Sequence, residues 1–245
     1  RIPEAKLEAL LNGEVDEAAL RAVAPVLNLH ADALVALAKH AYAPADHSVE
    51  GLLCFNTPYP VPGYEEMTVN AYLVYDPSRK LAVVFDTGAD ASPIINAIRE
   101  HDLDVHLILL THAHGDHIKD LMVLKNQTGQ PPTFISAKEL VQGAEPLATC
   151  QAMQVGTLTI QELETSGHSP GGTTYFIQGL DKPIAIVGDA IFAGSAGGAA
   201  DDWEHALSAI REKILTLPPE TILCPGHGPL TTVAEERNNN PLFAS

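Results

Sequence analysis

The segment Val105–Leu110 limits the possible folds more than any other part of the chain. It is a nearly continuous apolar run, interrupted only by His106. A short run of this kind predicts a strand that is buried on both faces, as in the core of a sandwich. The run ends directly at Thr111 and His112, so the chain becomes polar where this strand would leave the core. A strand covered on both sides requires further layers above and below it.

Short β-rich runs alternate with helical patterns from Gly51 onward. Strands are predicted at residues 52–55, 69–75, 81–85, 105–110, 133–135, 157–163, 173–178, 183–187 and 221–224. Helices are predicted at residues 92–100, 117–126, 136–141, 203–215 and 232–238. Two sheets covered by outer helices accommodate this order of elements, which places the chain in the α/β class.

The beginning of the chain has a different pattern. Apolar side chains in residues 4–40 recur at spacings of three and four residues, which predicts three short amphipathic helices. Pro44 ends the last of them, and a Pro-rich loop from Thr57 to Gly63 follows the next strand. We place a domain boundary near residue 48, between an N-terminal helical segment (1–48) and a main domain (49–245).

Residues 26–37 faintly resemble a helix-turn-helix, but their few basic side chains argue against contact with DNA. We therefore interpret the N-terminal helices as a packing or dimerisation element, which is compatible with a homodimer.

The composition excludes several classes of partner. A chain of 245 residues with 46% apolar side chains can bury one sizeable core. Its 14 basic and 31 acidic residues give a formal net charge of −17, which repels phosphate backbones and anionic membrane surfaces. No apolar run approaches the roughly 20 residues that cross a bilayer. We expect a cytoplasmic protein that binds a small-molecule substrate and neither nucleic acid nor membrane.

The three cysteines are Cys54, Cys150 and Cys224, which are far apart and form no C-x-x-C pair. Neither a disulfide framework nor a thiolate zinc site is indicated by this spacing. We expect three free, buried thiols.

Three imidazoles and a carboxylate follow the buried strand within six residues, at His112, His114, Asp116 and His117. Side chains alternate in an extended loop, so His112 and His114 would project to one side and meet one ion. Gly115 would let the chain turn, and Asp116 and His117 would open a helix and face a second ion. Burying so many ionisable groups without a cation would be costly, so the motif predicts a metal site.

Two ions need more ligands than this motif supplies, and later strand ends offer three candidates. His168 lies in Gly167–Gly172, Asp189 follows Val187-Gly188, and His227 lies in Pro225–Pro229. Glycine and proline on either side favour loops of fixed shape that can hold a ligand in place. The other histidines have no such neighbours, and we interpret them as surface or packing residues: His30, His40, His47, His101, His106 and His205.

These motifs, in this order, resemble the metallo-β-lactamase superfamily over roughly residues 50–245. The segments Ile191–Ser195 and Pro225–Phe243 are similar, more narrowly, to the glyoxalase II-like branch, which hydrolyses thioesters. The resemblance implies an αβ/βα sandwich with a short N-terminal helical extension. It also implies that His112, His114 and His168 hold one ion, that Asp116, His117 and His227 hold the other, and that Asp189 bridges both.

The ligand set predicts a hydrolase. Two divalent ions about 3.5–4 Å apart can share a water and lower its pKa towards neutrality. Asp116 and Asp189 would then assist proton transfer as catalytic carboxylates. We expect two divalent metal ions, zinc first and iron or manganese as alternatives, and no further cofactor. Ser195 sits in a Gly-rich loop but lacks a G-x-S-x-G elbow, which argues against a serine hydrolase.

The substrate is less constrained than the chemistry, because loops around such a site choose the acyl group. The first hypothesis is a thioester hydrolase that acts on an acylated glutathione or a similar thioester. The alternatives are a lactonase, β-lactamase or phosphodiesterase on the same scaffold, a mononuclear iron sulfur dioxygenase, and a metal-binding module without enzymatic activity. The segments Ile118–Asp120 and Ala196–Ala199 depart from common glyoxalase II-like sequences, which bears on the choice among these.

Overall fold

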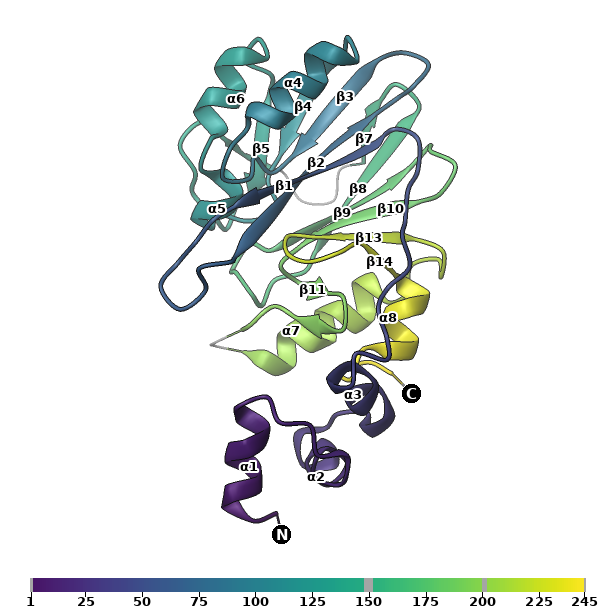
Figure 1. Ribbon diagram of the computed structural model, residues 1–245. Coiled ribbons are helices and arrows are strands. Elements are labelled where there is room, and N and C mark those ends of the chain that lie inside the picture. Colours follow the sequence, from purple (N-terminus) through teal and green to yellow (C-terminus); the bar gives the residue numbers. More distant parts are fainter. Residues whose placement is uncertain (1, 148–151, 200–201, 245) are drawn as a thin grey trace.

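Two six-stranded sheets pack face to face in the computed structural model, which describes residues 2–147, 152–199 and 202–244. Helices cover the outer face of each sheet (Figure 1). The α/β sandwich predicted from the order of the elements is therefore confirmed. Its N-terminal helical extension is present as well and lies at one end of the sandwich (Figure 1).

The first sheet is built by the first half of the main domain. Its strands lie in sequence order, and their bounds are β1 (Leu52–Pro58), β2 (Thr68–Tyr75), β3 (Leu81–Phe85), β4 (Asp104–Leu109), β5 (Thr133–Ser136) and β6 (Glu145–Leu147). The first three strands pair antiparallel, whereas β3 to β6 pair parallel. The crossover helices α4 (Ser92–Glu100) and α6 (Leu121–Gln127) lie on the outer face of this sheet (Figure 1).

The second sheet is built by the second half, in the order β14-β13-β10-β9-β8-β7. Its strands are β7 (Met153–Val155), β8 (Leu158–Glu164), β9 (Thr173–Gln178), β10 (Ile184–Gly188), β13 (Ile222–Pro225) and β14 (Thr231–Thr232). A small hairpin of β11 (Ile191–Phe192) and β12 (Ser195–Ala196) follows β10. Helix α7 (Trp203–Ala209), a π-helical turn (Ile210–Ile214) and α8 (Val233–Asn239) complete the domain.

Strand β4 contributes side chains to two apolar layers. Ile108, and Leu110 directly after the strand, pack into the layer between the first sheet and its helices, together with Ile94. Leu109 faces the opposite way and packs between the two sheets. The strand is therefore buried on both faces at its carboxyl end, as predicted, although His106 near its start is exposed. This burial fixes the position of the polar loop that begins at Thr111.

Two predicted helices differ from the structure. The helix predicted at 136–141 is wrong, because a turn follows β5 and the Glu139 side chain is used for contacts to other loops. The helix predicted at 117–126 is divided into α5 (Gly115–Ile118) and α6. Asp120 lies at the division, where its carboxylate accepts a hydrogen bond from the Ala91 amide at 3.0 Å. Strands β6, β7, β11, β12 and β14 were not predicted, because segments of two or three residues have no measurable periodicity.

The N-terminal segment contains α1 (Glu4–Leu11), α2 (Glu17–Val23), a 3₁₀ turn (Ala24–Leu27) and α3 (Ala31–Ala38). Helix α3 lies against α8, while α1 lies farthest from the sandwich (Figure 1). The amide of His30 donates to the Pro241 carbonyl at 2.7 Å. Leu37 packs against the β11–β12 turn at Gly194, where an added Cβ would lie 3.0 Å from the Leu37 side chain. These contacts tie the helices to the end of the chain and to the β11–β12 turn.

Deleting residues 1–46 is expected to cause aggregation or a change in assembly, because the surface that α3 covers at α8 and at the β11–β12 turn becomes exposed to solvent. Chemistry should persist in any fraction that stays in solution, because the candidate ligands all lie after residue 110. Light scattering coupled to size exclusion, with activity measured on the same fractions, checks both parts. A truncated protein that is monodisperse, unchanged in assembly and fully stable would contradict the packing role.

The cysteines agree only in part with the expectation of buried thiols. Cys224 is buried in β13 and free. Cys54 is also free but exposed, so the prediction is wrong for this residue, because β1 is an edge strand with one face open. Cys150 lies outside the described residues. No helix in the described ranges is both long and apolar enough to span a membrane.

Candidate metal centre

The side chains singled out in the sequence meet at one edge of the sandwich, where several strands end. The loop after β4 carries His112 and His114, and α5 carries Asp116 and His117. The second sheet supplies the rest from the β8–β9 loop, the end of β10 and the end of β13: His168, Asp189 and His227. Both sheets therefore contribute to one site.

The first group consists of His112, His114, His168 and Asp189. His114 Nδ1 lies 3.0 Å from His112 Nε2 and 3.0 Å from His168 Nε2. Asp189 Oδ2 lies 3.4 Å from His168 Nε2. Three ring nitrogens and a carboxylate oxygen thus converge on one point.

The second group consists of Asp116, His117 and His227. Asp116 Oδ2 lies 3.8 Å from His117 Nε2 and 3.3 Å from His227 Nε2. Asp189 also faces this group, with Oδ1 at 3.3 Å from His117 Nε2 and Oδ2 at 3.3 Å from His227 Nε2. The Asp189 carboxylate therefore lies between the two groups and touches both.

These distances fit divalent metal ions. Zinc–nitrogen bonds of about 2.0–2.1 Å place tetrahedral ligand atoms about 3.4 Å from one another, which is the spacing found within both groups. His117 Nε2 and Asp189 Oδ1 are buried without a hydrogen-bond partner in the part of the chain that the structure describes. A buried polar atom without a partner is costly, and a cation would satisfy both.

Backbone and carboxylate acceptors orient three of the imidazoles. The Nδ1 atoms of His168 and His227 lie 2.8 Å from the Gly198 carbonyl and 2.6 Å from the Thr68 carbonyl. Since a carbonyl only accepts, both rings donate from Nδ1 and leave Nε2 free for an ion. His117 Nδ1 has the same arrangement with Asp86 Oδ2, at 2.8 Å. Such partners of metal-ligating histidines fix the tautomer and the ring orientation.

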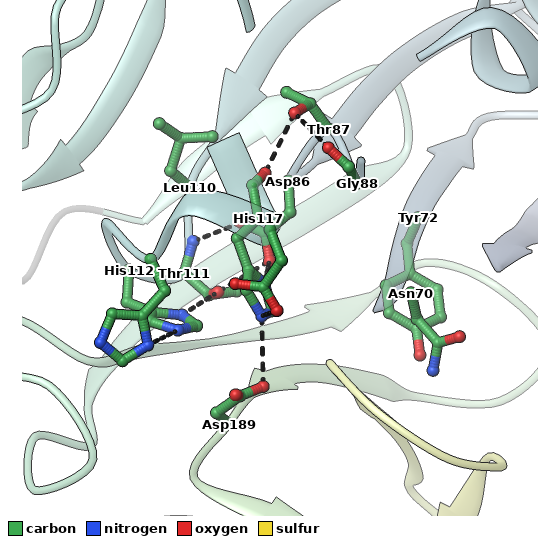
Figure 2. Close-up of polar contacts among 12 residues, drawn as sticks. Asn70, Tyr72, Asp86, Thr87, Gly88, Leu110, Thr111, His112, His117 and Asp189 are labelled. Atoms are coloured by element: carbon green, nitrogen blue, oxygen red, sulfur yellow. Dashed lines mark hydrogen bonds and ion pairs between the residues drawn. The ribbon is translucent and has the colours of Figure 1, made fainter. Parts of the chain in front are cut away.

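Asp86 was not singled out in the sequence, although it follows the predicted strand 81–85. It is buried, with a φ of 58°, in the left-handed region that non-glycine residues seldom adopt. Its carboxylate accepts hydrogen bonds from the amide and hydroxyl of Thr111, at 2.8 Å and 2.7 Å. Figure 2 shows Asp86 and Asp189 on opposite sides of the His117 ring. Asp86 therefore ties the first residue of the ligand loop to a ligand of the second group.

Asn70 and Tyr72 on β2, both labelled in Figure 2, form hydrogen bonds with the loop that carries His227. Asn70 Nδ2 donates to the Pro225 and Gly228 carbonyls at 3.0 Å and 2.8 Å, and the Tyr72 hydroxyl donates to Pro225 at 2.6 Å. Gly226 has to be glycine, because a Cβ there would contact Asp189 Oδ1 and lie 2.5 Å from His117 Cε1. The only sequence signal for Asn70 was a polar residue in an apolar strand.

Without a metal ion, two histidines of the site have lowered pKa values and two have raised pKa values. Burial lowers the pKa of His112 to about 2, and it also lowers that of His114. Burial disfavours charge on His117 and His227 as well, but carboxylates outweigh it and raise both pKa values to about 10. Asp86 and Asp189 act on His117, and Asp116 and Asp189 act on His227.

The carboxylates respond in the opposite sense. Burial alone would raise the pKa of Asp116 and Asp189, yet their histidine neighbours lower both. Two imidazolium groups thus supply the positive charge that the carboxylates require when metal is absent.

Loading the metal-free protein with zinc at pH 7 is expected to release about two protons per chain, because a coordinating imidazole must be neutral. The raised pKa values mean that His117 and His227 are protonated below pH 10 in the metal-free form. The apparent affinity of the second group, which contains His117 and His227, for zinc should therefore rise with pH. We expect a rise of about 100-fold per pH unit between pH 6 and pH 8. Titration in weak buffer with an indicator dye measures the protons. Release close to zero would contradict this charge assignment.

The histidines interpreted as surface or packing residues all lie outside the two groups, within the described ranges. Among them, His30 caps α3 and His47 pairs with Glu235 at 2.7 Å. His205 contacts the Ser166 hydroxyl at 3.0 Å, behind the His168 loop.

A two-sheet sandwich with paired His and Asp groups at its edge defines a metal-dependent hydrolase, and comparison with known proteins agrees. The sequence model described as "Metallo-beta-lactamase superfamily" matches residues 64–227. The chain belongs to the metallo-β-lactamase superfamily.

Similar proteins cover most of the main domain. The probable metallo-hydrolase YqgX of Bacillus subtilis is 31% identical over 197 residues, which are 71% of this chain and 92% of that protein. The hydroxyacylglutathione hydrolase GloC of Haemophilus influenzae is 29% identical over 210 residues, which are 76% of this chain and 96% of that protein. The crystal structure of the BLEG-1 B3 metallo-β-lactamase superposes with a TM-score of 0.64 at 30% identity, over 79% of this chain and 100% of that one.

Proposed function

We propose that this chain hydrolyses acyl thioesters at a dinuclear metal centre, in the manner of glyoxalase II, with a glutathione-like thiol as the leaving group. The observation that carries the proposal is the position of Asp189, whose carboxylate faces ligands of both groups at 3.3–3.4 Å. A shared carboxylate supports two ions side by side rather than one. The likeness to GloC over nearly its whole length supports the thioester.

In this proposal His112, His114 and His168 hold one ion, Asp116, His117 and His227 hold the second, and Asp189 contacts both. When bound, two divalent ions lower the pKa of water and polarise an acyl carbonyl. Nitrogen-rich groups of this kind suit zinc, and iron or manganese are the alternatives. Asp116 and Asp189 are ionised at neutral pH, because their pKa values are lowered, so their oxygens can accept the proton of the attacking water.

Side chains beside the ligand loop support a substrate with both apolar and anionic parts. Phe192 stacks edge-on against His227, with ring centroids 5.7 Å apart. The Tyr59 hydroxyl reaches the ligand loop, where a Cβ on Gly115 would lie 3.0 Å from it. Lys119 Nζ lies 5.4 Å from the centroid of the Tyr59 ring. In a chain of net charge −17, a lysine at this place favours a carboxylate-bearing substrate.

The test combines metal analysis of gently purified protein with a panel of an acylglutathione, a lactone, a β-lactam and a phosphodiester. We expect two ions per chain and the highest kcat/KM for the acylglutathione. His114→Ala should lose activity and metal while keeping the fold, because its ring leaves a loop and not the core. Highest kcat/KM for another substrate class, or oxygen consumption with a persulfide at a single iron, would overturn the proposal. Turnover above about a tenth of the wild type in His114→Ala would contradict the site.

Lys119→Met is expected to raise KM for the acylglutathione about tenfold and to leave kcat nearly unchanged, because a solvent-exposed charge steers and holds an anion without touching the reacting atoms. A neutral short-chain thioester serves as the matched substrate, and its KM should not change. Initial-rate kinetics at two salt concentrations provide the measurement. An equal rise in KM for both thioesters would show that Lys119 does not recognise the negative charge of the acylglutathione.

A further inference from the structure

Glu139 is a buried carboxylate that lies outside both metal groups and joins two of the ligand loops. It lies in the turn after β5 and is 9% exposed. Its Oε2 accepts a hydrogen bond from the Ala113 amide at 2.6 Å, and its Oε1 accepts one from the Gly171 amide at 2.9 Å. Each carboxylate oxygen therefore holds a different segment of the chain.

The two segments are the ones that carry the first metal group. Ala113 separates His112 from His114 in the loop that leaves the first sheet. Gly171 lies three positions after His168, in the β8–β9 loop of the second sheet. Glu139 thus connects the two sheets at the place where their three histidines meet.

The fit around Glu139 is close on the side of the second sheet. A Cβ on Gly171 would lie 2.6 Å from Glu139 Cγ and 2.9 Å from Ser136 Cβ. Only glycine lets this backbone approach the carboxylate so closely. The contact between Glu139 and Gly171 therefore depends on the backbone shape of the turn after β5 and of the β8–β9 loop.

The three imidazoles of the first group come from two loops that belong to different sheets. Their ring nitrogens approach to 3.0 Å in pairs, around His114 Nδ1. Their spacing therefore depends on how the backbones of the two loops are held relative to one another. One backbone bond, from the Thr173 amide to the Thr111 carbonyl at 3.0 Å, ties the loops near their bases. Glu139 ties them next to the ligands, through bonds that its charge strengthens.

We propose that Glu139 is a positioning residue that sets the spacing of His112, His114 and His168, and so the affinity of the first metal group. It is not a ligand, because both of its oxygens are engaged by backbone amides. The inference rests on the proposed metal centre, but it is independent of the thioester substrate.

The first test uses the metal-free protein and the variant Glu139→Gln. A glutamine offers one acceptor oxygen and an NH₂ group, so at least one of the two amides loses its partner. By NMR hydrogen exchange, we expect the amide of Ala113 or Gly171, or both, to exchange at least about tenfold faster than in the wild type. The Asn70 amide, which donates to Gly226 at 2.7 Å in the other ligand loop, is the internal reference and should not change.

The second test is a cobalt titration followed by visible absorption and by paramagnetically shifted imidazole protons. The wild type should bind two equivalents. In Glu139→Gln the group with His112, His114 and His168 should bind about 10- to 100-fold more weakly, while the group with Asp116, His117 and His227 keeps its affinity. Glu145→Gln, an exposed glutamate on the neighbouring strand β6, is the charge-matched control and should behave as the wild type.

Glu139→Asp gives a second variant in case the glutamine does not fold. It keeps the charge and both acceptor oxygens but is shorter by one methylene, so we expect an intermediate loss of affinity confined to the first group. Equal weakening of both groups, or wild-type exchange at both amides in Glu139→Gln and Glu139→Asp, would overturn the role of Glu139. If the wild type binds no cobalt, the proposed metal centre itself fails, and with it this role. That failure is distinguishable, because the exchange data still report whether the carboxylate bridges the loops.

Discussion

Replacing Asp189 by alanine is expected to lower kcat/KM by roughly a thousandfold, which corresponds to about 4 kcal/mol of transition-state stabilisation. The Asp189 carboxylate contacts ligands of both groups, and the residue is almost fully buried. Without it, Asp116 is the one carboxylate among the seven candidate ligands that still faces His117 and His227. We expect fewer than two tightly held ions per chain, measured by elemental analysis after gel filtration.

Asp181→Ala is the matched control for this experiment. Asp181 is an exposed aspartate in the turn between β9 and β10, at the opposite end of β10 from Asp189. Its removal changes the net charge by the same amount. We expect wild-type metal content and activity for this control. Two equivalents of metal still bound to Asp189→Ala would refute the bridging role, whatever the activity.

The two-sheet architecture could be predicted from the sequence because the patterns that indicate it are local. The apolar run at Val105–Leu110 predicted a strand buried on both faces, and the alternation of β-rich and helical patterns predicted two covered sheets. Strand pairing was not accessible in the same way. The short strands β6, β7 and β14 exist because neighbouring strands offer hydrogen bonds, and two or three residues show no periodicity of their own.

The candidate ligands were accessible for a related reason. Four of them lie within six residues, and the other three follow predicted strands between glycines and prolines. The structure brings all seven to one place. Asp86, Asn70 and Glu139 could not be found by such reasoning, because each acts on loops that are distant in the sequence. No spacing in the sequence identifies a carboxylate that accepts hydrogen bonds from the Ala113 and Gly171 amides. In addition, the turn that carries Glu139 was predicted as a helix.

Replacing Asp86 by alanine is expected to destabilise the metal-free protein by about 3–5 kcal/mol, because it breaks a buried charged network. Asp86 accepts two bonds from Thr111 and lies 2.8 Å from His117 Nδ1, so alanine removes the carboxylate acceptor of three buried donors. Urea unfolding with metal removed measures this effect separately from metal binding. The milder Asp86→Asn keeps the shape of the side chain, removes its charge and replaces one acceptor oxygen with an NH₂ donor.

Asp86→Asn also tests how the network acts on the site. The carboxylate orients the His117 ring and places a negative charge behind it that favours a bound cation, so the amide should weaken binding at the second group by about 10- to 100-fold and leave the first group nearly unchanged. Asp90→Asn is the matched control, because Asp90 is exposed in the same loop and asparagine can replace its bond to the Ser92 amide. If Asp86→Asn bound both ions as the wild type does, the charge of Asp86 would matter only for folding. His117 would then be oriented by a neutral hydrogen bond, since the asparagine oxygen can still accept one from His117 Nδ1.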